Sequence, residues 1–281
     1  MIITKINGGL GNQLFQYAVG RAVAIHHSVP LKLDISAFIN HKIHNGFRLD
    51  AFNVDAEIAN NQEIIRLAGN KTKITRFFRK LGLIKKKNYC KEKRRTIFDA
   101  RVFEQTPYYL DGYWQNEMYF SAIRQLILKE LTPKNELSYQ AKLFLREIMK
   151  CNSISLHVRR GDYLKHPEIG VLDLDYYQRA IEYIGEIVDS PVFFIFSNDL
   201  KWCKKNFNFL KNCVYVKNTE TEIDDLILMS KCKHNIVANS SFSWWGAWLN
   251  ENDGKIIVSP SKWMAHNPYN NKWVPDSWLQ F

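Results

Sequence analysis

The sequence predicts an α/β protein whose strands form parallel sheets, and three observations support this. Short apolar runs alternate with segments of helical periodicity, which is typical of parallel sheets with right-handed crossovers. An apolar content of 46% indicates a buried core, and 281 residues suffice for one large domain or two medium ones. Polar loops follow several predicted strands, and open α/β sheets bind ligands at that edge.

The first half begins with a strand at residues 1–6, a glycine-rich turn at 7–13 and a helix at 14–25. This is the outline of a phosphate-binding layout, because backbone amides at a helix N-terminus favour an anion. The spacing matches neither the dinucleotide fingerprint nor a P-loop, so tight packing is the alternative explanation of the glycines. The later predicted elements of this half are strands at 29–34 and 108–113 and helices at 57–68, 120–131 and 137–151.

Strands and helices alternate more clearly in the second half. The predicted strands lie at 153–156, 191–196, 213–217, 235–238 and 255–259, and the helices at 175–188, 201–206, 221–231 and 243–249. The apolar run at 192–196 indicates a strand that is buried on both faces. A boundary is expected in the crossing near 133–153, which gives domains at 1–150 and 151–281.

The net charge of +11 is confined to one segment. The chain has 39 basic and 28 acidic residues. Positions 71–95 hold twelve of the basic residues and one of the acidic ones, so the remainder has 27 of each and no net charge. Residues 74–84 place apolar side chains near one helical face and cations on the other, which is the pattern of a basic interfacial helix. A solvated basic loop is the alternative. The neutral remainder disfavours a nucleic-acid-binding protein.

The cysteines and the apolar runs indicate the compartment. Five cysteines without regular spacing predict free thiols rather than a disulfide framework. No CxxC pair or His/Cys cluster suggests a zinc site. Residues 1–5 do not begin a signal peptide, and no apolar run is long enough to span a bilayer. We therefore expect a protein of a reducing, intracellular compartment, either soluble or peripherally attached to a membrane.

The predicted strand at 153–156 leads into the heptapeptide His157-Val158-Arg159-Arg160-Gly161-Asp162-Tyr163. Two adjacent guanidinium groups repel each other, so folding alone gives little reason to place them at a strand end. An anionic ligand gives a reason, because each planar fork can bind a phosphate or carboxylate through two hydrogen bonds. The alternative is a solvated loop in which both arginines pair with Asp162.

Four polar loops follow predicted strands, at residues 7–13, 157–163, 197–199 and 239–243. The first loop offers glycine amides and Asn12, and the second offers the arginine pair. The last offers serine hydroxyls at the start of a helix. Four such loops are better explained by one shared anionic ligand than by chance. Without a metal-ligand cluster, the arginines would neutralise a leaving diphosphate. This predicts a metal-independent nucleotide-sugar enzyme, or a phosphate-binding module without chemistry.

Four sequence blocks carry a resemblance to a known family. The blocks are HVRRGDY at 157–163, GGLGNQLFQYA at 8–18, SNDLKW at 197–202 and NSSFSWWGAWL at 239–249. In these blocks and their order, the chain resembles the bacterial α1,2-fucosyltransferases of glycosyltransferase family 11. The resemblance covers most of the chain, whereas segment 71–95 lies outside it.

The resemblance implies a fold of GT-B type, with two Rossmann-like domains that face each other across a cleft. Domain 1–150 would hold the acceptor, and domain 151–281 would hold GDP-β-L-fucose. The implied reaction is an inverting, metal-independent transfer of L-fucose to the 2-hydroxyl of a terminal galactoside, in O-antigen or surface glycan synthesis.

The expected partners are GDP-fucose and a galactose-terminated, lipid-linked acceptor glycan, with no nucleic acid and no cofactor. The expected location is the cytoplasm, at the inner face of the bacterial inner membrane.

The resemblance also implies roles for individual residues. Arg159 would bind the β-phosphate of GDP with Arg160 beside it, and His157 would approach the nucleoside. Asp225 would accept hydrogen bonds from N1 and N2 of guanine, although the residues alone favour an exposed helix acid. The remaining positions are Ser240, Ser241 and Phe242, at the diphosphate and nucleoside, and Asn12, across the cleft near the sugar and phosphate.

The general base is the least defined part of the predicted mechanism. An inverting transfer to a sugar hydroxyl calls for a group that accepts the proton. Asp162 is the first candidate and Glu168 is the second. Asp162 has an alternative role as a brace that orients Arg160, and a phosphate oxygen is an alternative base.

Three competing hypotheses differ in what they predict. An enzyme of the same fold with another acceptor or linkage would yield a different product, which linkage analysis identifies. A nucleic-acid-binding protein that uses segment 71–95 would lose affinity steeply with salt and would not turn over GDP-fucose. A non-catalytic sugar-nucleotide binder is disfavoured by the intact pair of Arg159 and Arg160.

We also hypothesise that segment 71–95 brings the protein to a lipid-linked acceptor by contact with an anionic membrane surface, because all the excess charge lies there. Deletion of the segment is expected to abolish cosedimentation with anionic liposomes. Unchanged liposome binding after the deletion would contradict the hypothesis.

Overall fold

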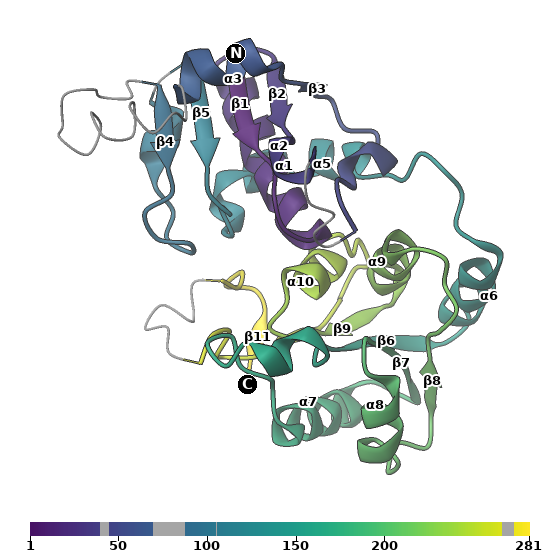
Figure 1. Cartoon of the computed structure of the whole chain (residues 1–281). Helices are drawn as coiled ribbons and strands as arrows, with labels where there is room; N and C mark the ends of the chain where they lie inside the picture. Colours follow the sequence, from purple (N-terminus) through teal and green to yellow (C-terminus); the bar gives the residue numbers. More distant parts are fainter. Residues whose placement is uncertain (40–44, 70–87, 105, 266–272) are drawn as a thin grey trace. The chain divides into compact units, whose positions relative to one another are not determined.

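The computed structural model describes residues 1–39, 45–69, 88–104, 106–265 and 273–281. The chain divides into two compact units, Met1–Lys134 and Asn135–Phe281. Each unit is an α/β structure around an all-parallel sheet, which confirms the predicted fold class (Figure 1).

The boundary between the units follows Lys134, which lies within the predicted crossing at 133–153 but before the predicted domain limit at residue 150. Helix α6 (Tyr139–Ile148), which was assigned to the first domain, belongs to the second unit. Its residues Ala141, Phe144 and Ile148 are buried in a hydrophobic cluster with Phe194 of that unit's sheet. Sequence periodicity shows that α6 has an apolar face, but it does not show which sheet buries that face.

The sheet of the first unit has five strands in the order β3-β2-β1-β5-β4. They are β1 (Ile2–Lys5), β2 (Leu31–Asp34), β3 (Glu57–Ile58), β4 (Tyr89–Lys91) and β5 (Tyr108–Asp111). Strands β2 and β3 lie on one side of β1, and β5 and β4 lie on the other (Figure 1). The strand order therefore reverses between β1 and β5, so the loops after these two strands are neighbours.

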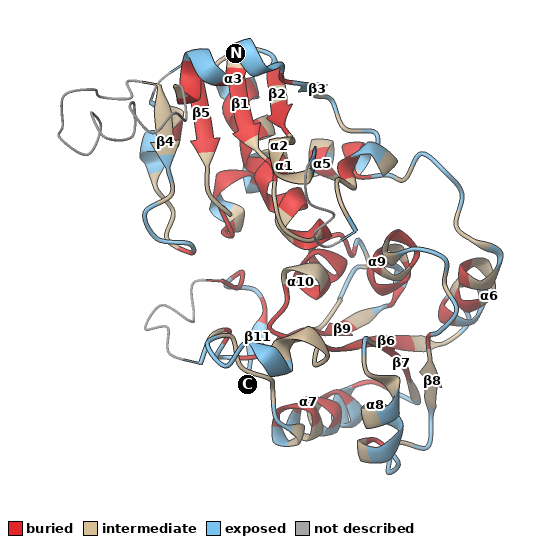
Figure 2. Cartoon of the chain, viewed as in Figure 1, coloured by how far each residue is buried: buried red, intermediate tan, exposed pale blue. Residues whose placement is uncertain are grey.

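Helices cover both faces of this sheet. The unit contains α1 (Leu10–His26), α2 (Ser36–Ile39), α3 (Asn61–Ala68), α5 (Arg124–Glu130) and the 3-10 helices Leu49–Ala51, Ala100–Phe103, Glu117–Tyr119 and Ser121–Ile123. Gly20 lets α1 approach β1 closely, because a Cβ atom there would lie 2.1 Å from the Thr4 Oγ1 atom. On the other face, Ile3 and Tyr109 form a buried cluster with Leu67 of α3 (Figure 2).

The sheet of the second unit has six strands in the order β11-β10-β9-β6-β7-β8. They are β6 (Asn152–Val158), β7 (Pro191–Ser197), β8 (Cys213–Tyr215), β9 (His234–Ile236), β10 (Ile257–Ser259) and β11 (Leu279–Gln280). The chain starts this sheet at β6, adds β7 and β8 on one side, and then adds β9, β10 and β11 on the other (Figure 1). Strand order reverses between β6 and β9.

Strand β7 shows how this sheet is covered on both faces. Besides α6, the helices of the unit are α7 (Leu174–Ile187), α8 (Leu200–Asn206), α9 (Glu222–Lys231), α10 (Ser241–Trp248) and the 3-10 helix Asp162–Lys165. Phe193 and Ile195 pack in the cluster formed with α7 and α8, whereas Phe194 and Phe196 pack in the cluster formed with α6 and α9. This two-sided burial explains the continuous apolar run in the sequence.

The structure corrects the predicted elements of the first unit. Helix α1 begins at Leu10, so the predicted turn at 7–13 ends inside the helix and Asn12 is helical. The helix predicted at 57–68 begins only at Asn61, and its first residues form β3 instead. Strands β3, β4 and β11 have two or three residues each and show no periodicity that could have revealed them.

The helix predicted at 74–84 lies outside the described residues. Part of segment 71–95 is described, and there β4 pairs in parallel with β5. The membrane hypothesis stays a prediction. A deletion that tests it has to end before Tyr89, because β4 belongs to the sheet.

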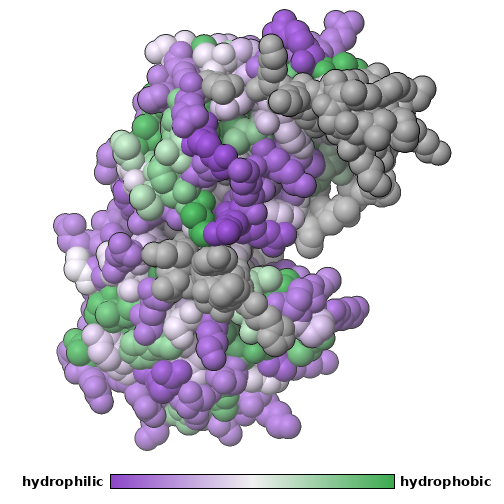
Figure 3. All heavy atoms as spheres, turned by 90° about the vertical axis from the view of Figure 1, so that its left-hand side faces the viewer, coloured by the Kyte–Doolittle hydropathy of each residue, from purple (hydrophilic) through white to green (hydrophobic). Residues whose placement is uncertain are grey.

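Within the described ranges, no helix has the length and apolar composition needed to cross a bilayer. On the face shown in Figure 3, hydrophobic residues lie interspersed among hydrophilic ones.

Candidate active site

The HVRRGDY heptapeptide lies at the switch point of the second unit. Strand β6 ends at Val158, between β9 and β7, so residues 159–163 have neighbouring loops on both sides. These are the loops after β9 and after β7, which are two of the four polar loops predicted to share a ligand. A switch point at the carboxyl edge of a parallel sheet is where open α/β folds bind ligands.

Arg159 is held in place but retains donor capacity. Its Nη2 atom donates to the Asp162 Oδ2 atom at 2.8 Å, and its guanidinium lies 5.5 Å from the ring centre of Tyr163. The Nε atom is buried and has no hydrogen-bond partner among the described residues. A guanidinium that is fixed on one edge and unsaturated elsewhere is suited to bind a phosphate.

Arg160 has different surroundings. Its guanidinium carbon lies 4.3 Å from the ring centre of Trp202, and its Nε atom lies 3.7 Å from the Asp199 Oδ2 atom. Both partners belong to the start of α8 or to the residue that caps it. The repulsion between the adjacent arginines is thus relieved, because each guanidinium has a different acidic partner.

Asp162 braces Arg159, so the prediction that it orients Arg160 is wrong. Its second oxygen, Oδ1, accepts a hydrogen bond from the Asn198 Nδ2 atom at 3.1 Å. Burial opposes ionisation of Asp162, but the hydrogen bond and charge of Arg159 outweigh it and hold the pKa below its ordinary value. A carboxylate with a low pKa and both oxygens engaged is poorly suited to accept a proton.

Glu168, the second candidate base, is exposed and engaged elsewhere. Its side chain is 62% exposed and pairs with His166 at 3.1 Å. Hydrogen bonds from its own backbone and from His166 hold its pKa below the ordinary value. The structure therefore does not bring Glu168 together with the heptapeptide's arginines.

Asn198 belongs to the predicted polar loop at 197–199, but the sequence assigned it no role of its own. Its Oδ1 atom accepts the backbone N–H of Arg160 at 3.0 Å, while its Nδ2 atom donates to Asp162. A Cβ atom at Gly161 would lie 2.6 Å from that Nδ2 atom, so this close contact requires glycine. The sequence signals were its position after the strand that became β7 and its place in the SNDLKW block, and neither shows which residues it contacts.

His157 lies at the end of β6 as a buried, neutral imidazole. Its side chain is 4% exposed, and its Nδ1 atom has no hydrogen-bond partner among the described residues. Burial, helped by the positive charge of Arg159, lowers the pKa to about 3. The ring centre lies 5.9 Å from that of Phe242, so the structure brings these two predicted residues together.

Helix α10 presents its N-terminus at the same edge of the sheet. Ser240 is buried and caps the helix, accepting the backbone N–H of Phe242 at 3.4 Å. Ser241 and Phe242 form the half-buried first turn. The Tyr163 hydroxyl donates to the Asn239 carbonyl at 3.4 Å, which links the heptapeptide to this loop. Backbone amides at a helix start favour an anionic ligand.

Of the two adjacent acids in the first turn of α9, Asp225 accepts fewer hydrogen bonds than Asp224. Asp224 accepts backbone N–H groups from Ser138, Glu220 and Thr221. Asp225 accepts one side-chain hydrogen bond, from the Thr219 hydroxyl at 2.9 Å. Burial raises its pKa to about 6, and the neighbouring acids add to this effect. A partly buried carboxylate with a raised pKa favours a binding role over an exposed helix acid.

Asn12 belongs to the first unit, in the first turn of α1. Its Oδ1 atom accepts a hydrogen bond from the Gln115 Nε2 atom at 2.8 Å, so it links the loops after β1 and β5. Gly8 has φ +78°, and a Cβ atom there would lie 2.8 Å from the Asn12 Nδ2 atom. Gly8 therefore serves close packing around Asn12, which is the alternative explanation of the glycines in this turn.

The two doubly wound units, one of which gathers arginine, histidine and a helix N-terminus at its switch point, match the GT-B fold. Solved structures support this fold. The chain is similar to the fucosyltransferase NodZ from Bradyrhizobium, with a TM-score of 0.52 and 12% identity. The similarity covers 87% of this chain and 91% of NodZ. It is also similar to a variant of Arabidopsis thaliana FUT1 bound to GDP, with a TM-score of 0.54 and 10% identity. The similarity covers 91% of this chain and 69% of that chain.

The chain belongs to glycosyl transferase family 11, whose model matches residues 1–276. The alpha-1,2-colitosyltransferase of Escherichia coli is 34% identical, over 100% of this chain and 98% of that protein. The O-antigen biosynthesis glycosyltransferase WbnK of Escherichia coli is 37% identical over 98% of each. The resemblance drawn from the four sequence blocks is thereby confirmed.

The buried, neutral state of His157 predicts a pH dependence of stability. The pKa of His157 is about 3 in the folded chain, and an unfolded histidine titrates near 6.5. Between these values only the unfolded state binds the proton, so stability falls as the pH is lowered through 6.5. From pH 7 to pH 5 the expected loss through this residue is about 2 kcal/mol.

Urea unfolding at pH 7 and pH 5, for the wild type and for His157→Gln, measures this contribution. The variant is expected to lose less stability on acidification than the wild type does, by about 2 kcal/mol. Equal losses in both proteins would show that His157 is not buried in its neutral form.

Proposed function

We propose that this glycosyltransferase moves L-fucose from GDP-β-L-fucose to the 2-hydroxyl of a terminal galactoside, with inversion at the anomeric carbon and without a metal ion. The observation that supports this most strongly is the guanidinium of Arg159, fixed by Asp162 at the switch point with a buried, unpartnered Nε atom. Relatives add support, including the galactoside alpha-(1,2)-fucosyltransferase 2 of Hylobates lar, 26% identical over 96% of this chain and 74% of that protein.

The second unit is the proposed donor site. A NodZ structure of the same fold was soaked with GDP-fucose. In this chain, Asp225 is proposed to accept the N1 and N2 hydrogens of guanine, because an acceptor-only carboxylate distinguishes guanine from adenine. His157 and Phe242 are proposed to contact the nucleoside. Ser240 and Ser241 are proposed to hold the diphosphate through the amides of the α10 N-terminus.

In the proposed reaction, the acceptor oxygen attacks C1 of fucose from the face opposite the phosphate. The bond between C1 and the β-phosphate oxygen breaks, and its electron pair remains on that oxygen. The charge on the β-phosphate grows toward the transition state, so a fixed guanidinium at Arg159 stabilises the transition state more than the ground state. Because Asp162 is engaged with Arg159 and Asn198, we propose that a phosphate oxygen accepts the hydroxyl proton.

Arg160 is proposed to support Arg159 rather than to bind the phosphate itself. Its side chain is 18% exposed and lies between Trp202 and Asp199. Its backbone N–H fixes Asn198, which in turn holds Asp162. The effect of Arg160 on turnover is therefore expected to act through the position of the loop.

The biological setting is proposed from a relative. WbnK is described by its name as an O-antigen biosynthesis glycosyltransferase. We propose that this chain likewise adds a residue to a surface glycan, on a lipid-linked acceptor at the cytoplasmic face of the inner membrane. The first unit is the proposed acceptor side.

A second donor is favoured by one specific observation. A relative that aligns over the whole chain is named an alpha-1,2-colitosyltransferase. Colitose is L-fucose without the 3-hydroxyl, so the two donors share the guanine and diphosphate contacts. Discrimination would therefore depend on the pocket for the sugar ring.

The test of the proposed reaction is release of GDP in EDTA, with GDP-fucose or GDP-colitose as donor and lactose or methyl β-galactoside as acceptor. Acceptor-dependent GDP release in EDTA and a 2-linked α-fucoside product are the expected results. Loss of turnover in EDTA that Mg²⁺ or Mn²⁺ restores would contradict the metal-free reaction. A clear preference for GDP-colitose would show that the transferred sugar is colitose and not fucose.

Variants of the loop after β6 test the proposed roles. Arg159→Ala is expected to lower kcat by about 100-fold or more, because it removes a donor that acts on developing charge. Asp162→Asn is expected to lower kcat about tenfold and to leave the pH profile unchanged. Glu168→Gln, the matched control at an exposed carboxylate, should keep the wild-type rate. A pH profile that loses its acidic limb in Asp162→Asn would make Asp162 the general base, because protonation of a catalytic carboxylate lowers the rate at low pH.

A further inference from the structure

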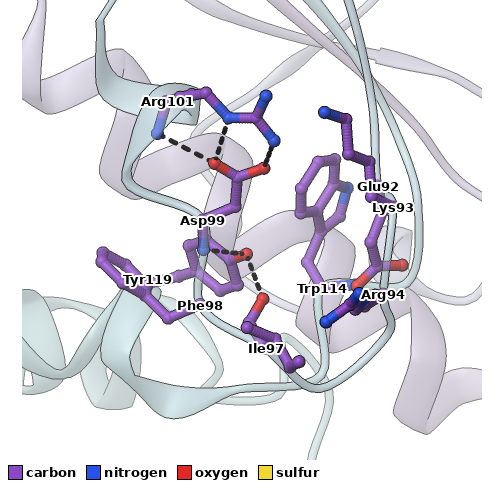
Figure 4. A pocket seen from close by; sticks show the side chains of 9 residues that line it. All are labelled: Glu92, Lys93, Arg94, Ile97, Phe98, Asp99, Arg101, Trp114 and Tyr119. Carbon is purple, nitrogen blue, oxygen red and sulfur yellow. Dashed lines mark hydrogen bonds and ion pairs between the residues drawn. The ribbon is translucent and has the colours of Figure 1, made fainter.

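A cavity of about 340 Å³ lies in the first unit, and none of its lining residues belongs to the proposed donor site. Figure 4 shows Trp114 between the pair Phe98 and Tyr119 on one side and the segment from Glu92 to Arg94 on the other. The three aromatic rings form one cluster, with ring centres 4.9 Å apart for Phe98 and Tyr119 and 5.7 Å apart for Trp114 and Tyr119. The volume lies within the usual range of small-molecule sites.

The cavity is at the carboxyl edge of the first sheet. Strands β4 and β5 are parallel neighbours, and the residues that follow them, from Glu92 and from Gly112 onward, leave the sheet at the same edge. The loop after β5 also contacts α1: the Gln115 side chain donates to Asn12, and the Gln16 side chain donates to the Gly112 carbonyl at 3.2 Å. The cavity therefore adjoins the point where the strand order of this unit reverses.

Glu92 holds the loop after β5 in a strained conformation. Its two carboxylate oxygens accept the backbone N–H groups of Tyr113 at 2.7 Å and Trp114 at 2.9 Å. Trp114 has φ +56°, which is an unfavourable region for a bulky side chain. A Cβ atom at Gly112 would lie 2.4 Å from the Glu92 Cβ atom. Strain of this kind persists where the surrounding contacts determine a functional geometry.

The charges that line the cavity favour a polar, uncharged ligand. Asp99 and Arg101 pair with each other, with the Arg101 Nε atom 2.7 Å from the Asp99 Oδ1 atom. Glu92 carries a carboxylate close to the basic side chains of Lys93 and Arg94, so the wall has both signs of charge. Burial raises the pKa of Glu92 to about 7, so near neutral pH its carboxyl group can donate a hydrogen bond as well as accept one. Hydroxyl groups can donate to the carboxylate and accept from the cations, and an aromatic ring suits the C–H face of a sugar.

We infer that this cavity binds a pyranoside ring of the acceptor glycan, with Glu92 and Lys93 contacting its hydroxyls and Phe98 packing against its C–H face. The inference rests on the proposed function, because it gives the second substrate of that reaction its site. Glu92 and Phe98 are then specificity-determining residues for the acceptor, and the donor nucleotide does not depend on them.

The test uses the full-length protein and two readouts. Isothermal titration with lactose and with methyl β-galactoside, in the absence of any donor, measures acceptor binding. Steady-state kinetics with GDP-fucose measure KM separately for donor and acceptor. The variants are Glu92→Gln, Phe98→Leu and the exposed Lys93→Gln, with Glu104→Gln as the matched control at an exposed glutamate outside the cavity. Thermal unfolding verifies that each variant is folded.

Glu92→Gln and Phe98→Leu are expected to weaken galactoside binding, and to raise the acceptor KM, by about tenfold, the equivalent of one lost hydrogen bond or ring contact. The donor KM should stay within about twofold of the wild type, and Glu104→Gln should match the wild type throughout. Lys93→Gln should show a smaller loss in the same direction. Because Lys93 is exposed, that variant tests the cavity even if the buried substitutions perturb folding.

The outcomes separate the inference from the proposed function. Wild-type acceptor affinity in all three cavity variants would overturn the inference, even if the enzyme transfers fucose. Failure of the wild-type protein to bind either galactoside, or binding of inorganic phosphate that depends on Lys93, would also overturn it. Galactoside binding that depends on Glu92, in a protein that transfers neither sugar, would support the inference and refute the proposed function.

Discussion

The site of the second unit depends on the side-chain amide of Asn198. The amide accepts the backbone N–H of Arg160 and donates to Asp162, so it bridges the two ends of a tight loop. Asp162 in turn fixes Arg159 through a hydrogen bond of 2.8 Å. The two adjacent arginines can follow one strand because the loop directs one guanidinium to Asp162 and the other to Trp202 and Asp199. Arg159 pairs with Asp162, as the interpretation as a solvated loop predicts, and Arg160 does not; the interpretation as an anion site stays a prediction, which the unpartnered Nε atom of Arg159 favours.

The first unit uses a similar construction at its own switch point. Gly8 packs against the amide of Asn12 as Gly161 packs against the amide of Asn198. The Asn12 side chain accepts from Gln115, which follows the neighbouring strand β5. In each unit the glycine follows the first strand of the sheet, and a partner residue follows a parallel neighbour of that strand. The pairs are Gly8 and Gln115 in the first unit, and Gly161 and Asn198 in the second. A side-chain amide suits this place because it donates and accepts at once, and so joins two loops that have no backbone ladder between them.

The sequence predicted the parts of the fold and site that are local in the chain. An alternating run identified β6 and a continuous apolar run identified β7, and the heptapeptide marked the edge at which Arg159, His157 and Phe242 meet. It did not identify Asn198 or Trp202 as partners of the arginines, because these contacts join strands that are about forty residues apart and depend on strand order. Glu92 was hidden for another reason: it is the single acid in a strongly basic segment, and only the sheet shows that β4 places it beside Trp114.

The hydrogen bonds of Asp224 have a consequence for the pair of aspartates at the start of α9. In the sequence, Asp224 and Asp225 are equivalent neighbours, but Asp224 ties the amide of Ser138, the cap of α6, to the cap of α9. The first helix after the unit boundary is therefore anchored one residue away from the carboxylate that is proposed to recognise the base. The two acids are not exchangeable. A substitution of Asp224 is expected to affect the folding of the unit, and a substitution of Asp225 is expected to affect which nucleotide binds. Selection on donor specificity can act at Asp225 while the entrance to the unit remains intact.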